Sequence, residues 1–229
     1  MNDRLHRGSD VGEEALIGAY LLAKETVLEA GFAYEIDWQE DRSFDSVSEP
    51  DFLREAAWVI LSAGMRECVV RRKFLALSQA FLEWESASAI TQHKNDCRRA
   101  ALLCFSHKAK INAILNLVEH VAALSYPEVR RNVVAGGLTY LETFAFIGPV
   151  TRYHFAKNLG LDVVKPDRHL MRISAAAGYT SPEEMCRLIS RFTGEKIAVV
   201  DVVLWRFATL RSDYISAFRT ACLPVLLND

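Results

Sequence analysis

The chain has 229 residues, a formal net charge of −2 and an apolar fraction of 51%, which is enough for a sizeable core. It contains no apolar run of membrane-spanning length and no secretory signal, so we expect a cytoplasmic protein without membrane contact. The five cysteines include no C-x-x-C pair, which argues against a disulfide framework, a zinc site or an iron–sulfur cluster and favours reduced, mostly core thiols (Cys68, Cys97, Cys104, Cys186 and Cys222).

The dominant period of the first half of the chain is helical. Residues 13–31 carry apolar residues at three- and four-residue spacing, whereas residues 32–50 have no such period and are interpreted as a long loop. Asp51 is placed to cap a helix over 52–64, and another helix is predicted over 69–86.

The second half continues this pattern. Helices are predicted over 97–124 with a break near Ser106, and then over 126–137, 138–144, 181–194, 196–209 and 213–223. Ser181 and Glu184 have the spacing of a capping box. The stretch KIAVVDVV alone would also suit a buried strand, but no alternating partner strand exists elsewhere. We therefore predict an all-α fold.

Residues 144–173 read FAFIGPVTRYHFAKNLGLDVVKPDRHLMRI and contain two helix starts. Gly148 permits a tight turn between two helices, and Pro149 suits a first helical position. The amides that begin the second helix form an anion site that a DNA phosphate could occupy. Further on, Asp167 stands where it caps the next helix. On spacing alone, Asp167 is either a cap or a catalytic carboxylate.

The segments FAFIGPVTR and KPDRHLMRI together resemble the helix-hairpin-helix (HhH-GPD) DNA glycosylase superfamily. Its pattern is a Gly-rich hairpin followed by Asp-x-His-x-x-Arg, which Asp167, His169 and Arg172 match in register. Weaker similarity, to the LLSAQ region and the KA…I helix of the family, extends the resemblance over roughly residues 52 to 210. Phe146 stands where the family has its first hairpin glycine.

The hairpin is most similar to the monofunctional branch that removes alkylated bases. Val150 occupies the position where bifunctional members carry their Schiff-base lysine, so no amine is present there. Lys157 lies two helical turns further on, within reach of phosphate but not of the sugar C1′ in the geometry of the family. The resemblance therefore implies water as the nucleophile, no lyase step, no cofactor and no metal.

The family mechanism assigns roles to further residues. Asp167 would stabilise an oxocarbenium-like sugar or orient the water. The base must leave the stack, so a pocket and a gap-filling wedge are needed. His154 would contact the flipped base or be a structural histidine. Met65 with Arg66 would form the wedge, and the alternative for Met65, which its residue type favours, is plain core packing. The residues implied to hold DNA phosphates are Gly148, Val150, Thr151, Arg152, Lys157 and Lys165.

Charge is distributed unevenly along the chain. Basic groups occur at 69–73, 97–100, 107–110 and 129–131, while acidic residues crowd the segment 35–49. This segregation would allow a basic DNA-binding face despite the net negative charge, although each group alone is typical of a solvated helix face. Tyr34, Glu35 and Trp38 combine stacking and hydrogen-bonding groups, which suits base recognition or a packed loop.

We expect a monomer with two helical lobes and DNA in the cleft between them. One lobe would comprise 1–51 and 164–229, and the other, a helical barrel over 52–163, would end in the hairpin at about 138–159. The expected function is a monofunctional glycosylase acting on double-stranded DNA that contains an alkylated or otherwise modified base. Two alternatives remain open: a phage-defence glycosylase that removes bulky modified bases, and a non-catalytic DNA-binding module in which Asp167 only caps.

Overall fold

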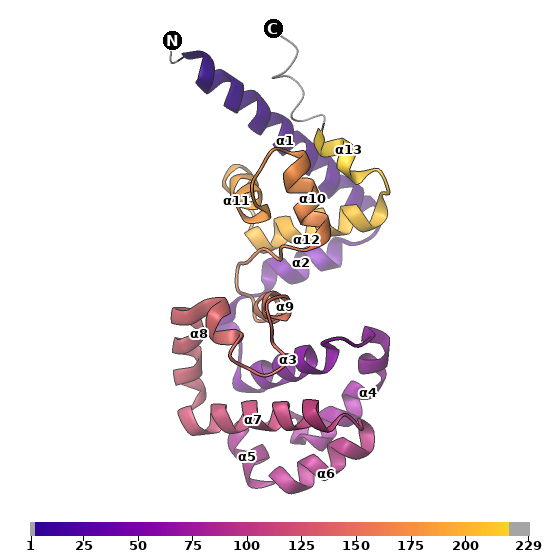
Figure 1. Cartoon of the computed structure of the whole chain (residues 1–229), viewed down its shortest axis with the longest axis vertical. Helices are drawn as coiled ribbons and strands as arrows, with labels where there is room; N and C mark the ends of the chain where they lie inside the picture. Colours follow the sequence, from indigo (N-terminus) through magenta and orange to yellow (C-terminus); the bar gives the residue numbers. More distant parts are fainter. Residues whose placement is uncertain (1–2, 220–229) are drawn as a thin grey trace. The chain divides into compact units, whose positions relative to one another are not determined.

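The computed structural model describes residues 3–219, with side chains from residue 12 onward, and every regular element in this range is a helix (Figure 1). The expected all-α class is thus confirmed. No helix among the described residues has both the length and the apolar character needed to cross a bilayer. The thiols of Cys97 and Cys186 are buried, as expected of core cysteines, but Cys68 is exposed. Cys222 lies outside the described residues.

The chain forms two compact units. The first comprises the chain up to Arg42 and from Asp162 onward. Its helices are α1 (Asp3–Glu29), α2 (Ala33–Asp41), α10 (Arg168–Ala176), α11 (Pro182–Thr193), α12 (Ile197–Leu210) and α13 (Tyr214–Arg219). Helix α12 contacts each of the other five (Figure 1). This position explains why KIAVVDVV is helical, because a helix that is apolar on most sides is stable when others surround it.

The second unit spans Ser43–Leu161. Its helices are η1 (Phe44–Ser46), α3 (Glu49–Ser62), α4 (Glu67–Ala80), η2 (Leu82–Trp84), α5 (Ala87–Gln92), α6 (Lys94–Cys104), α7 (Lys108–Leu124), α8 (Tyr126–Leu141) and α9 (Thr151–Asn158). Helix α7 packs against α3, α5, α6 and α8 (Figure 1). The gap between α6 and α7 contains Ser106, where the break was predicted.

The structure corrects the interpretation of residues 32–50 as a loop, because α2 and η1 lie within this stretch. It also groups residues 43–51 with the second unit, whereas the predicted division assigned them to the other lobe. Contacts explain this placement. The Tyr126 hydroxyl donates to the Val47 carbonyl at 2.7 Å. Gly160 lies so close to Ser43 that an added Cβ would come within 2.8 Å of its backbone.

Helix capping differs from the prediction in detail. Helix α3 is capped by Ser48, and the predicted cap Asp51 is instead the third helical residue of a reciprocal capping box. At α11, the Ser181 hydroxyl accepts the Glu184 amide at 3.1 Å, as expected. The Glu184 carboxylate, however, accepts the Thr180 hydroxyl at 2.7 Å, so the predicted box forms in one direction only.

Candidate functional site

The hairpin segment, residues 138–159, lies in the second unit. Helix α8 bends at Gly137, which has a φ of 50° and a ψ of −133°, and it ends at Leu141. Helix α9 begins only at Thr151. The connection is therefore longer than the sequence suggested, and Pro149 precedes the helix instead of occupying its first position.

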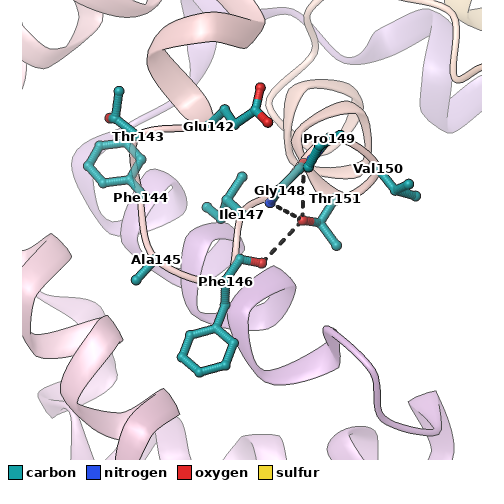
Figure 2. A pocket seen from close by; sticks show the side chains of 10 residues that line it. All are labelled: Glu142, Thr143, Phe144, Ala145, Phe146, Ile147, Gly148, Pro149, Val150 and Thr151. Atoms are coloured by element: carbon teal, nitrogen blue, oxygen red, sulfur yellow. Dashed lines mark hydrogen bonds between the residues drawn. The ribbon is translucent and has the colours of Figure 1, made fainter.

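Thr151 closes the loop between the two helices. Its Oγ1 accepts the Gly148 amide at 2.8 Å and lies 3.1 Å from the Phe146 carbonyl oxygen, to which the hydroxyl donates (Figure 2). Phe146 has a φ of 68°, in the left-handed region that favours glycine. The backbone therefore has a glycine-like conformation where the family pattern has glycine, and a phenylalanine adopts it at an energetic cost.

The loop surrounds an open hollow of about 610 Å³ lined by residues 142–151 (Figure 2). Val150 precedes α9 and is 67% exposed. The first turn of α9 contains no acidic residue, so no side chain in that turn opposes an anion at its amides. Arg152 pairs with Glu142 at 2.5 Å, and this contact competes with the phosphate-binding role implied for Arg152.

Asp167 lies in the first unit and caps α10. Its Oδ1 accepts the amides of His169 at 2.8 Å and Leu170 at 3.0 Å, and the residue is half-buried. Within the described part of the chain, Oδ2 forms no hydrogen bond. Asp167 therefore does cap a helix, as its spacing predicts, but the cap uses one oxygen and leaves the other able to meet a ligand.

Two buried or partly buried contacts fix the backbone before Asp167. The amide of Lys165 donates to Oδ2 of Asp201 at 2.6 Å, and Asp201 is only 2% exposed. Asp162 Oδ1 accepts the Ala198 amide at 2.8 Å at the start of α12. Sequence reasoning missed both aspartates. For Asp201 the signal is a single acidic residue within the apolar run of α12, since a buried carboxylate needs hydrogen-bond partners.

His169 extends this arrangement on the other side of Asp167. Its Nδ1 lies 3.2 Å from the Tyr214 hydroxyl, and its Nε2 accepts a hydrogen bond from Nε of Arg168 at 3.2 Å. The histidine of the Asp-x-His pattern thus links the first turn of α10 to α13.

Met65 and Arg66, the predicted wedge, lie in the turn between α3 and α4. Gly64 has a φ of 67°, Met65 is half-buried and Arg66 is exposed. Met65 lines a second hollow of about 260 Å³ together with Val69, Lys73, Phe105, Ser106 and His107. Met65 is therefore not enclosed in the core.

The residues predicted to read the base occupy different elements. Tyr34, Glu35 and Trp38 lie on α2 in the first unit, and His154 lies half-buried on α9 in the second. Tyr34 and Trp38 are 63% and 47% exposed. Glu35 instead pairs with Arg206, whose Nε donates to Oε2 at 2.8 Å. Its carboxylate is therefore already engaged within the protein.

The predicted basic face is weaker than the sequence suggested. Arg71, Arg99 and Arg131 form ion pairs with acids three or four residues away on their own helices, Glu67, Asp96 and Glu128 respectively. Lys73 donates to the Cys104 carbonyl at 3.0 Å. Local pairing of this kind lowers the field that these groups could present to DNA.

The chain matches no known protein family, curated protein or solved structure in the comparisons made with each.

Proposed function

We propose that this protein is a monofunctional DNA glycosylase that hydrolyses the N-glycosidic bond of a flipped-out, modified base. The main support for this proposal is the hydrogen bonding of the Asp167 carboxylate. One of its carboxylate oxygens caps α10, and the other makes no hydrogen bond within the described chain. Such a carboxylate is rigidly held and still able to act.

Hydrolysis of the N-glycosidic bond requires stabilisation of the positive charge that develops on the sugar. As the bond between C1′ and the base nitrogen breaks, the sugar becomes oxocarbenium-like, and a carboxylate held nearby stabilises this positive charge. Water then forms the new bond to C1′, the base leaves with the electron pair of the broken bond and takes up a proton, and an abasic site remains. Val150 offers no amine at the position that would otherwise form a Schiff base, so hydrolysis ends the reaction.

The hairpin segment would hold the duplex. The amides at the start of α9 have no acidic neighbour in their turn, and the adjacent loop forms an open surface around Gly148 and Val150. A phosphate is a natural ligand for such amides. Base flipping further requires a side chain to fill the vacated stack, and Met65 or Arg66 would supply it.

A second candidate is a non-catalytic DNA-binding module. The observation in its favour is that Asp167 forms a cap with two amide bonds, which alone would explain an aspartate at this position. In this case the hairpin segment would bind duplex DNA without any bond being broken.

An abasic-site assay separates the candidates. The protein is incubated with untreated plasmid, alkylated plasmid and phage DNA containing bulky modified bases, and abasic sites are counted. Abasic sites in alkylated plasmid would support a repair-type glycosylase. Abasic sites in phage DNA alone would support a phage-defence glycosylase. Binding to all three without any abasic site would leave the non-catalytic module.

A further inference from the structure

Lys110 is a buried cation in the first turn of α7. It is 2% exposed, and its Nζ donates to the carbonyl oxygens of Leu61 at 2.5 Å and Ala63 at 2.6 Å. These carbonyls are at the C-terminal end of α3, where helical carbonyls lack partners within the helix. Lys110, which belongs to a neighbouring helix, thus caps the C-terminal end of α3.

The location is unfavourable for a lysine. Burial removes the ammonium from water and lowers the pKa of Lys110 below its usual value. A cation in the first turn of a helix also opposes the helix dipole. Lys110 therefore does not stabilise α7 itself. Its role must lie in the hydrogen bonds that it donates to the Leu61 and Ala63 carbonyls.

Those contacts fix the turn that carries the candidate wedge. The Ala63 carbonyl immediately precedes Gly64, and the Met65 amide donates back to the Ser62 carbonyl at 3.0 Å. By holding the Leu61 carbonyl in the last turn of α3 and the Ala63 carbonyl at the start of the turn, Lys110 limits where Met65 and Arg66 can lie.

Lys110 also meets the hairpin segment. Its Nζ lies 5.7 Å from the ring centroid of Phe146, within the range of a cation–π contact. The same ring packs edge-on against His107 with a centroid distance of 6.1 Å. Nδ1 of His107 in turn accepts the Lys110 amide at 3.4 Å. One side chain therefore contacts both the wedge turn and the loop before α9.

We propose that Lys110 is a positioning residue that holds the 63–66 turn and the Phe146 loop at a fixed spacing, so that both engage one DNA duplex together. This inference rests on the proposed function. It assigns Lys110 no contact with DNA. It requires that losing Lys110 weaken recognition of DNA with a vacated base position more than binding of intact duplex, because only the former uses the wedge turn.

The test compares two lysines of the same helical turn. Lys110→Met removes the buried ammonium, and Lys108→Met removes an exposed charge from the same helix as a matched control. Each variant is titrated against an intact duplex and a duplex with a stable tetrahydrofuran abasic analogue, which requires no knowledge of the natural base. We expect Lys110→Met to lower the preference for the analogue by about tenfold or more, the scale of small misplacements in such sites. Lys108 belongs to the basic group 107–110, so any loss of binding in Lys108→Met should affect both duplexes alike and leave the preference unchanged.

Two further variants keep the test decisive if Lys110→Met unfolds. Lys110→Arg retains a cationic donor and should restore part of the preference. Phe146→Leu removes the ring at a position that is 39% exposed, so it should fold and lower the preference as well. If the folded variants all keep the wild-type preference, the role of Lys110 is refuted and the proposed function stands. If wild-type protein itself shows no preference for the analogue, both proposals fall.

Discussion

Oδ1 of Asp167 accepts the amide of Leu170 at 3.0 Å, which makes the candidate catalytic carboxylate a helix cap as well. The two roles separate in Asp167→Asn. An asparagine oxygen still accepts the amide, so stability should change little. Stabilisation of an oxocarbenium-like sugar needs negative charge, so excision should fall by about a hundredfold or more.

Single-turnover excision measures this effect, with thermal unfolding and DNA binding as controls that should match the wild type. An Asn variant that excised bases at a near wild-type rate would make Asp167 a cap alone.

Val150 predicts the outcome of borohydride trapping. The wild-type protein has no amine at this exposed position, so reduction in the presence of substrate DNA should give no high-yield covalent complex. Val150→Lys places an amine there with a backbone already in a helical conformation, and a trapped complex should appear. The complex is detected as a band of reduced mobility in a denaturing gel. Efficient trapping by the wild type would show that another amine is the nucleophile.

We expect the stability and DNA binding of the hairpin segment to depend on the Thr151 hydroxyl. Thr151→Ala removes the acceptor for the Gly148 amide and the donor to the Phe146 carbonyl, and it should cost about 1 kcal/mol of unfolding free energy. The loop would also relax, so duplex binding should weaken. Thr151→Ser keeps the hydroxyl and is the matched control in denaturant unfolding and DNA titration. Equal binding by the Ala and Ser variants would show that the hydroxyl does not shape the DNA site.

We expect the contribution of Tyr126 to the free energy of unfolding to decrease at alkaline pH. Burial raises its pKa to about 12, and its hydroxyl donates to the Val47 carbonyl at 2.7 Å. Because the folded pKa lies above the unfolded value of about 10, this contribution is complete below pH 10 and is lost as the pH rises toward 12. Tyr126→Phe should therefore cost about 1 kcal/mol near neutral pH and less at high pH.

Urea unfolding at about pH 8 and about pH 11 tests this dependence through the difference between variant and wild type. Burial also raises the pKa of Tyr20 and Tyr140, so the wild-type decline should persist in part. A difference that stayed constant with pH would contradict the role of Tyr126.

Local signals made some features predictable from sequence. Asp167 caps α10 because a short acidic side chain satisfies amides two and three residues ahead, and this relationship is visible in the sequence itself. The break near Ser106 is local in the same way. Contacts distant in sequence were not predictable. Lys110 reaches carbonyls that precede it by 47 and 49 residues, and nothing in its own helix indicates them.

Helix α2 is a whole element that the sequence does not predict, because it too depends on contacts distant in sequence. It buries only Ile36 and Gln39, so its apolar residues give no helical period. Contact with α12 supplies what the local sequence lacks, through a salt bridge between Glu35 and Arg206. From the sequence alone the segment therefore has the pattern of a loop, in which Glu35 suits either base recognition or packing within the loop.

We expect the ion pair between Glu35 and Arg206 to stabilise the fold. The Arg206 guanidinium lies 4.1 Å from the ring centroid of Phe32 and 4.6 Å from that of Trp205, and it binds both carboxylate oxygens of Glu35. The two charged side chains are 17% and 18% exposed. Removing one charge leaves the other poorly solvated, so Glu35→Gln and Arg206→Gln should each destabilise the protein by about 2 kcal/mol.

A double-mutant cycle by denaturant unfolding tests the pair, and the double variant should lose less than the sum of the single losses. The same variants distinguish structure from base reading when excision is measured well below their unfolding temperatures. If Glu35 only holds Arg206, both single variants should excise at similar rates. If Glu35→Gln alone lost excision while Arg206→Gln retained it, the carboxylate would contact the base, and the ion pair would be a resting arrangement that DNA replaces.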